Sequence, residues 1–364
     1  MSDLTGPTAG PIVGPIVGPV EIVGAGLIGT SIGLACRRAG LEVLLTETSD
    51  DHLRTASGLG AGRATTADDR PQLVVVAVPP DHLGEQIARA LEGGAVVTDV
   101  GSVKAGPLAA VAARPGVERY VGGHPMAGSE RSGPLAASAA LFDGRPWAVT
   151  PHPGSTPEAV ALVEALALLC GAVPVRLTPD EHDKAVARTS HLPHLLAALA
   201  AGALAGAPAE HLALSGQGVR DVTRVAAGDP ALYGQIVAAN AQAVGALLTG
   251  VRERLDVVIE ALAGGDRAGV EAVLSEGVSG TRVIPGKHGG PARPTGTVFV
   301  AVPDHAGELA RLFADAGASE VNIEDVRIDH DPGRPVGLVE LTVDVDRAEH
   351  LLASLESKGW VTHR

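Results

Sequence analysis

The sequence predicts an α/β protein: a Rossmann-like, doubly wound domain, then an all-α domain, then a small α+β domain. Three observations support this. Short β-branched runs alternate with helical stretches up to about residue 178, residues 179–284 carry helix signals without strand runs, and residues 285–296 contain seven Gly or Pro in twelve. We therefore expect a disordered leader (1–18), a doubly wound domain (19–178), a helical domain (179–284), a linker (285–296) and an α+β domain (297–364).

Composition excludes several classes of protein. The formal net charge of −14 argues against a nucleic-acid or anionic-membrane partner. Cys36 and Cys170 are isolated, which fits a reducing compartment and gives no sign of a zinc site. The first residues lack the cationic start of a signal peptide, and the apolar run Leu195–Pro208 is too short to cross ~30 Å of hydrocarbon. We expect a cytoplasmic protein.

The doubly wound domain is predicted from its strand runs. The N-terminal GPIVGPIVGPVEIVG repeats Pro every fourth residue, and Pro cannot donate to a strand ladder, so the first strand is expected at Val20–Val23. The later runs are near-continuously hydrophobic, which is typical of parallel strands buried on both faces. These runs are EVLLTE, LVVVAVP, AVVTDVG, YVGGHP, WAVT and VPVRLT.

The helical domain is expected to contain one long helix, Asp229–Ala263, with Asp as N-cap, Pro in the first turn and two closing glycines. Its length is roughly 50 Å. The segment Leu195–Ala207 is apolar nearly all round and is expected at the centre of a bundle, and we expect a homodimer built through this domain. The predicted buried stripe of the long helix is Ile236, Asn240, Val244, Leu247, Val251, Leu255, Val258 and Leu262.

The last domain is predicted to have the order βαββαβ. A TVFVAV strand is followed by a helix, two strands, a second helix and a short tail strand. The expected bounds are Asp304–Ala316 and Arg347–Lys358 for the helices and Val321–Ile328 and Val336–Val345 for the central strands.

A dinucleotide site is predicted where the first strand runs into a GxGxxG, with Gly24, Gly26, Leu27, Ile28 and Gly29 as its residues. The glycines let backbone amides approach a pyrophosphate at a helix N-terminus. Glu47 ends the second strand, where a carboxylate binds ribose hydroxyls and repels a 2′-phosphate, so NAD is favoured over NADP, although Thr48 and Ser49 could soften that preference. Val78 and Pro79, which end the LVVVAVP run, are further cofactor candidates.

Four polar stretches interrupt otherwise apolar surroundings: DVGSVK at 99–104, GGHPMAGSE at 122–130, TSHLPH at 189–194 and RDVTR at 220–224. Each also has a structural explanation. Ser102 can cap a helix starting near Val103, and His124 can be an ordinary loop histidine. His191 and His194 lack a third ligand at a matching spacing, so no metal is expected.

The arginines of the fourth stretch also allow two interpretations. Arg220 and Arg224, one turn apart, could form a solvated helix face. They could instead form a local cationic site for an anionic substrate, with Asp221 orienting Arg224. The region has almost no other cations, which favours the second interpretation.

In combination, GLIGTS, DVGSVK, GGHPMAGSE, TSHLPH and RDVTR resemble the prephenate and arogenate dehydrogenases of tyrosine biosynthesis, from about residue 20 to the end. The terminal domain, with PDHAGEL at 303–309 and VNI at 321–323, resembles an ACT domain, an amino-acid-sensing module. The resemblance implies NAD-dependent oxidative decarboxylation of prephenate to 4-hydroxyphenylpyruvate.

The resemblance also implies roles for individual residues. His124 is the base that takes the C4 hydroxyl proton, with Ser102 hydrogen-bonded to it and to the substrate. Arg224 binds a substrate carboxylate, and Arg220 is a second electrostatic contact. The remaining substrate residues are His194, which lines the pocket, Ser190, toward the nicotinamide, and Ser129 and Glu130, near the substrate's charged end.

Regulation and the alternatives follow from the same comparison. Asp304 is expected to cap a helix, while amides near Gly307 and the side chain of Asn322 could clasp tyrosine as a feedback inhibitor, although His305-Ala306 departs from the usual Arg-Pro turn. Arogenate is the alternative substrate, because Glu130 would suit its ammonium group. A non-catalytic NAD-binding amino-acid sensor is less favoured by the intact set of polar residues, and a β-hydroxyacid dehydrogenase with a lysine base does not explain TSHLPH.

Overall fold

The computed structural model describes residues 15–128, 132–284, 294–330 and 336–364. The chain forms two compact units, residues 1–252 and 253–364. The predicted fold class is confirmed: a Rossmann-like domain, a helical domain and a C-terminal sheet domain follow one another along the chain.

The main sheet of the first unit is parallel and has the strand order β3-β2-β1-β4-β5. The order reverses between β1 and β4, and ligands of open α/β sheets bind at the carboxyl ends of the strands at such a switch point. The strands are β1 (Val20–Val23), β2 (Val43–Thr46), β3 (Arg63–Ala64), β4 (Leu73–Val76) and β5 (Val96–Asp99).

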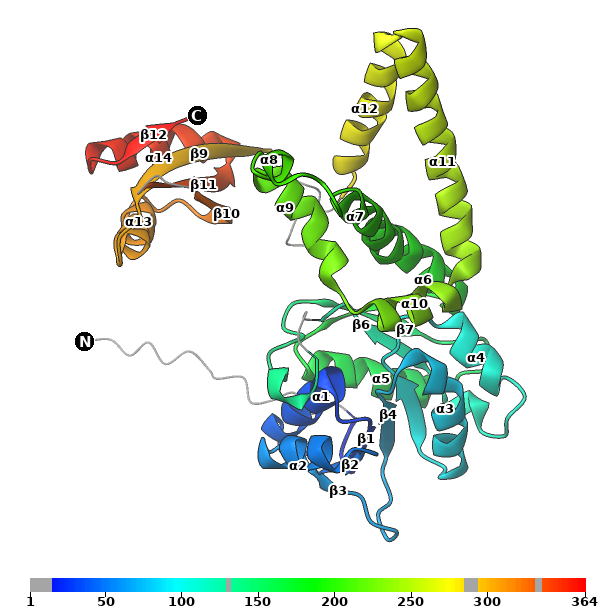
Figure 1. Ribbon diagram of the computed structural model, residues 1–364. Coiled ribbons are helices and arrows are strands. Elements are labelled where there is room, and N and C mark those ends of the chain that lie inside the picture. Colours follow the sequence, from blue (N-terminus) through cyan, green and yellow to red (C-terminus); the bar gives the residue numbers. More distant parts are fainter. Residues whose placement is uncertain (1–14, 129–131, 285–293, 331–335) are drawn as a thin grey trace, which may run out of the picture. The chain divides into compact units, whose positions relative to one another are not determined.

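Helices cover both faces of this sheet (Figure 1). Along β4, Leu73 and Val75 face a core shared with α1, while Val74 and Val76 face a second core shared with α3. This alternation explains why the strand is apolar throughout. The helices are α1 (Leu27–Arg38), α2 (Asp50–Gly58), α3 (Leu83–Glu92) and α4 (Ala105–Val111).

The last three strands of the predicted parallel sheet form a separate sheet, which corrects the prediction. In it β6 (Gly122–Pro125) pairs antiparallel with β7 (Pro146–Thr150), and β7 pairs parallel with β8 (Val173–Arg176). The described residues between β6 and β7 hold one short 3-10 turn and no crossover helix, so the chain returns antiparallel. Between β7 and β8, α5 (Pro157–Leu169) provides the crossover that a parallel pair needs.

The predicted leader is wrong where the structure describes it. Ile16 is 1% exposed and belongs to the main core. The backbone N–H groups of Val17 and Gly18 donate to Gln72 Oε1 at 2.9 and 2.7 Å, and Gln72 Nε2 donates to Pro15 at 3.0 Å. The side-chain amide of Gln72 therefore provides the hydrogen bonds for a backbone segment that its prolines keep out of the strand ladder. The rest of the predicted leader, residues 1–14, lies outside the described residues.

The predicted single helix Asp229–Ala263 is broken at Asn240. Asp229 caps α10 (Pro230–Ala239) as expected, but α11 (Ala241–Gly264) leaves at an angle of 95°. Asn240 Nδ2 donates to the carbonyl oxygen of Asp183 at 2.8 Å and lies 3.2 Å from His191 Nδ1. Asn240 thus belongs to a polar contact with α6, which the helical periodicity could not reveal.

The remaining helices of this unit precede Asn240. They are α6 (Pro179–Val186), a π-helical turn (Ala187–His191), α7 (Leu192–Gly202), α8 (Ala209–Leu212) and α9 (Gln217–Arg224). The chain leaves Leu196 and Leu199 of α7 exposed, contrary to the expected central position. Among the described residues no single helix is long and apolar enough to cross a membrane, and α10 and α11 pass that test only as a bent pair.

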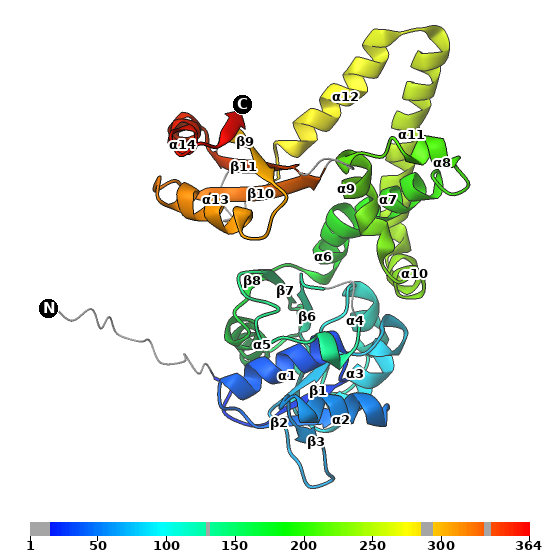
Figure 2. The ribbon, with the colours of Figure 1, turned by 60° about the vertical axis from the view of Figure 1, so that its left-hand side comes forward.

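The second unit contains the end of α11, the helix α12 (Arg267–Thr281) and an antiparallel sheet of order β10-β11-β9-β12. Helices α13 and α14 share one core with this sheet (Figure 2). The predicted βαββαβ order is confirmed. Its elements are β9 (Thr295–Pro303), α13 (Glu308–Gly317), β10 (Ile323–His330), β11 (Val336–Asp344), α14 (Val345–Ser357) and β12 (Val361–His363).

One helix start in this unit differs from the prediction. Asp304 does not cap α13, because the chain first passes through Gly307 in the left-handed region, at φ +95°, and the helix begins at Glu308. A glycine takes this conformation at little cost, so it sets the start of the helix.

The packing of the N-terminal segment predicts a stability difference between adjacent residues. Ile16→Ala should lower the free energy of unfolding by about 2–4 kcal/mol, because it leaves a cavity in the main core. Val17 is 81% exposed, so Val17→Ala should change the free energy of unfolding by less than about 0.5 kcal/mol. Urea unfolding of the two variants measures this; equal, small effects would mean that the segment does not pack.

Candidate active site

The local geometry explains, differently at each position, why the β1–α1 turn has three glycines. Gly24 has φ +102°, and a Cβ there would lie 2.4 Å from the carbonyl oxygen of Ala77. A Cβ on Gly29 would lie 2.0 Å from the carbonyl oxygen of Gly24, so this position lets α1 approach the strand. At Gly26 a Cβ would meet nothing within 4 Å, which leaves open space before α1 where an anion can approach the amides.

Glu47 is tied to the same turn. Its carboxylate accepts the N–H of Ala25 at 2.7 Å and that of Ser49 at 2.9 Å. Burial raises the pKa of Glu47, but these hydrogen bonds outweigh it and leave the pKa below the ordinary value, so the group is ionised. Leu27 and Ile28 form the first turn of α1, and Val78 approaches Gly24, with Pro79 next along the chain. The residues fit a dinucleotide.

His124 lies on β6 and is half-buried. Its Nδ1 lies 2.9 Å from Nε2 of His182, and Nδ1 of His182 lies 2.8 Å from Oδ1 of Asp183. His182 is 1% exposed. The three side chains form a continuous polar chain from the second sheet to α6.

Asp183 also caps α4. It accepts the N–H of Lys104 at 2.8 Å and that of Ala105 at 2.9 Å. Burial alone would raise the pKa of Asp183, but the hydrogen bonds from His182 and the two backbone groups lower it by a larger amount. The pKa therefore lies below its ordinary value, and the carboxylate is ionised. The alternative interpretation of Ser102 as the cap of this helix is not seen, because a carboxylate from α6 accepts these N–H groups.

A buried ion pair lies beneath His124. Lys104 and Asp99 have fully buried side chains and pair directly, and Lys104 Nζ also donates to the carbonyl oxygen of Gly123 at 2.7 Å. Tyr120 Oη donates to Asp99 at 2.8 Å. A Cβ on Gly123 would lie 2.9 Å from the carbonyl oxygen of Asp99, so this glycine is required for β6 to pack over the pair.

The surroundings of His124 keep its imidazole neutral. Burial is the largest effect and lowers its pKa well below 6.5, and repulsion by His182, Lys104 and His191 lowers it further. A neutral imidazole in contact with a second histidine can accept a proton.

Ser102 and Ser190 do not join this chain in the structure. Ser102 is half-buried, and among the described residues His124 is hydrogen-bonded to His182 and not to Ser102. Ser190 lies in the π-helical turn, which directly precedes α7, with Pro193 in the first turn of that helix. Such turns often occur at functional sites. Ser129 and Glu130 lie outside the described residues.

The helical residues expected to bind substrate lie on α7 and α9. His194 is buried and stacks on Tyr233, with ring centroids 3.5 Å apart and planes 4° apart. Arg220 and Arg224 are exposed on α9, and within the described residues neither forms an ion pair. The expected role of Asp221 is not seen, because its carboxylate accepts from Gln217 at 2.9 Å.

The expected effector residues lie in the second unit. Asp304, Gly307 and Asn322 are exposed, and Asn322 Nδ2 donates to Glu324 Oε1 at 2.8 Å. A ligand amino acid would have to compete with Glu324 for that amide. Binding at this turn stays a prediction.

Sequence reasoning missed three residues around His124: His182 and Asp183 of the polar chain, and Lys104 of the buried ion pair. The stretch EHDK at 181–184 reads as an ordinary acidic first turn, capped by Thr178. The available signal was an adjacent His-Asp pair beside the TSHLPH stretch. Lys104 belonged to the DVGSVK stretch, and its signal was a lysine within an apolar environment.

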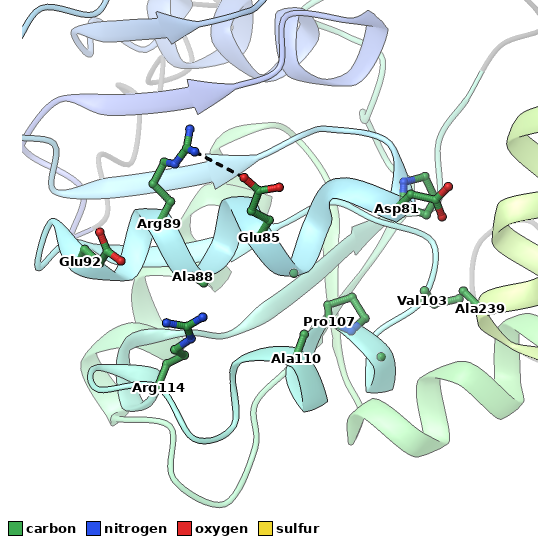
Figure 3. Close-up of a pocket in the computed structure, with 13 residues that line it drawn as sticks. Asp81, Glu85, Ala88, Arg89, Glu92, Val103, Pro107, Ala110, Arg114 and Ala239 are labelled. Atoms are coloured by element: carbon green, nitrogen blue, oxygen red, sulfur yellow. Dashed lines mark hydrogen bonds and ion pairs between the residues drawn. The ribbon is translucent and has the colours of Figure 1, made fainter.

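A surface pocket elsewhere in the first unit contains none of the predicted site residues. It lies between α3 and α4 (Figure 3), and its polar lining includes Glu85, paired with Arg89 at 3.4 Å, and Arg114. Its lining includes no histidine. Chemistry therefore points to the His124 chain rather than to this pocket.

Comparison with family models gives two matches. Residues 32–184 match the model described as prephenate dehydrogenase, nucleotide-binding domain. Residues 178–276 match the model described as prephenate dehydrogenase, dimerization domain. The two matches meet at α6, the helix that carries His182 and Asp183.

Individual proteins give the same result. The chain is 37% identical over 355 residues to "Probable prephenate dehydrogenase NovF" of Streptomyces niveus, covering 93% of this chain and 98% of the relative. It resembles the structure of A. aeolicus prephenate dehydrogenase with hydroxyphenyl propionate and NAD+, at 26% identity and TM-score 0.65, over 74% and 99% of the chains. It also resembles Synechocystis arogenate dehydrogenase, at 26% identity and TM-score 0.60, over 72% and 98%.

The open space at Gly26 predicts a binding defect without a folding defect. Gly26→Val should leave the unfolding midpoint unchanged but raise the dissociation constant for NAD at least tenfold, which corresponds to about 1.4 kcal/mol. Gly29→Ala is the contrasting variant, since its Cβ would overlap the carbonyl oxygen of Gly24. This variant should have a lower free energy of unfolding. Calorimetric titration with NAD measures the affinity; unchanged binding by Gly26→Val would exclude a pyrophosphate at this turn.

Proposed function

The chain belongs to the prephenate dehydrogenase family, and we propose that it oxidises and decarboxylates prephenate to 4-hydroxyphenylpyruvate with NAD. The family matches span residues 32–276, and the 37% identical relative covers 93% of the chain. The observation that carries the proposal is His124, a neutral imidazole held by a buried polar chain and itself half-buried.

The reaction needs one base at the C4 hydroxyl. NAD, when bound, accepts the hydride from C4. His124 Nε2 takes the hydroxyl proton, so that C4 becomes a carbonyl carbon rather than a cation. The C–C bond to the carboxylate at the opposite ring carbon then breaks and carbon dioxide leaves; its electron pair moves through the ring to the C4 oxygen, which takes up a proton, and the ring becomes aromatic. A positioned base of this kind contributes typically ~10²- to 10⁴-fold to the rate.

The substrate's negative charges need local cations, because the chain as a whole carries a net charge of −14. Arg224 is proposed to bind a carboxylate through its planar fork, with Arg220 as a second contact. Both are exposed on α9, and the turn Val225–Ala227 that follows Arg224 packs against α7, the helix that carries His194. Ser102 is proposed to contact the substrate hydroxyl, and Ser190, Ser129 and Glu130 to border the site.

Arogenate is a second candidate substrate. The similarity to Synechocystis arogenate dehydrogenase favours it, and the ammonium group of arogenate would suit a carboxylate at Glu130. NAD is proposed over NADP because Glu47 is ionised and tied to the glycine turn, where it would repel a 2′-phosphate.

Assembly, regulation and location complete the proposal. A homodimer is supported by the match to a dimerization-domain model and by the exposed leucines of α7. Tyrosine as a feedback effector of the C-terminal domain rests on its resemblance to an ACT domain. A cytoplasmic location fits the two buried, free cysteines.

The proposed function predicts the outcome of one assay with a matched pair of variants. The purified chain should reduce NAD with prephenate, and His124→Asn should lower kcat at least tenfold while KM stays within a few-fold, because only proton removal is lost. His211→Asn, at an exposed position on α8, is the control and should retain full activity.

Absorbance of the reduced cofactor follows the reaction, and prephenate and arogenate are each offered with NAD and with NADP. No reduction with any of the four pairs would overturn the enzyme proposal. Normal turnover by His124→Asn would overturn the assignment of the base.

A further inference from the structure

We propose that His182 and Asp183 are positioning residues that fix the tautomer of His124 and stabilise the proton it receives. The inference rests on the proposed role of His124 as the base. It concerns two residues on α6 that the sequence motifs did not single out, and it is carried by the contacts around them.

The tautomer follows from the end of the chain. Asp183 is ionised and can only accept, so His182 must carry its proton on Nδ1, 2.8 Å from the carboxylate. With its proton on Nδ1, His182 presents the lone pair of Nε2 as an acceptor. The contact of 2.9 Å from that Nε2 to His124 Nδ1 therefore requires a proton on His124 Nδ1. His124 Nε2 is left without a proton, as a base requires.

The same chain stabilises the product of the proton transfer. When the C4 O–H bond breaks and its proton bonds to His124 Nε2, the ring becomes an imidazolium. Its Nδ1–H then donates a charge-assisted hydrogen bond to His182, which Asp183 polarises from the other side. His124 can thus be neutral in the free protein, with its pKa well below 6.5, and still accept a proton during the reaction.

Residues from several elements hold His182 and Asp183 in position. Thr178 caps α6 through Glu181, and Asn240 donates to the carbonyl oxygen of Asp183 at 2.8 Å. The backbone N–H groups of Lys104 and Ala105 hold both carboxylate oxygens. Because these contacts do not involve the His182 ring, replacing that ring leaves them in place and removes its two links, to His124 and to Asp183.

The test compares two replacements of His182 in the full-length chain, with NAD and prephenate. Leu cannot accept a hydrogen bond, whereas the Oε1 of Gln can take the place of His182 Nε2. His182→Leu should lower kcat at least tenfold with KM within a few-fold, and His182→Gln should recover most of the loss. Equal losses in the two variants, in proportion to their loss of folded protein, would mean a structural role and overturn the proposal.

A second measurement does not depend on activity or on the folding of the His182 variants. ¹⁵N spectra of the wild-type protein labelled at histidine report which ring nitrogen carries the proton, and the His124 signals are those that disappear in His124→Asn. The expected result near pH 7 is a proton on Nδ1 and none on Nε2; a proton on Nε2 would overturn the proposal. A wild-type chain that fails to oxidise prephenate would instead contradict the proposed function, and the tautomer result would stand on its own.

Discussion

The carboxylate of Asp183 is the constraint on which the candidate site depends. It is 7% exposed and receives three hydrogen bonds, from His182 and from the backbone of Lys104 and Ala105. A buried charge is tolerated only when hydrogen bonds satisfy it in this way. The carboxylate and its three hydrogen-bond donors therefore hold one another in fixed positions. Through these bonds it joins α6 to the start of α4 and, by way of His182, to His124.

A second buried charge fixes the strand that carries His124. Lys104 pairs with Asp99 at the end of β5 and holds the carbonyl oxygen of Gly123. Removing one partner of such a pair typically costs about 3–5 kcal/mol, because the other charge is left unpaired. Lys104 therefore contributes twice: its backbone N–H binds Asp183 and its side chain positions β6. The glycines before His124 serve this packing.

The features that sequence could predict are those set by local chemistry. The GxGxxG turn follows from steric demands at Gly24 and Gly29, and Asp229 caps its helix with its own side chain. The features that it missed depend on distant partners. The break at Asn240 comes from Asp183 and His191, and the cap of α4 comes from another helix. Likewise Ile16 is buried because Gln72 holds its flanking backbone, which no local pattern indicates.

The central claim is that His124 is kept neutral by its surroundings and serves as the base. The charged and titratable groups that face it are His182 and, beyond it, Asp183, with Lys104 and His191 nearby. The most direct test is the pH dependence of kcat/KM for prephenate with the wild-type protein. Since the pKa of His124 is lowered, activity should persist below pH 6.5 and fall only as the pH drops through that lower pKa. An acid limb at or above pH 6.5 would contradict the account.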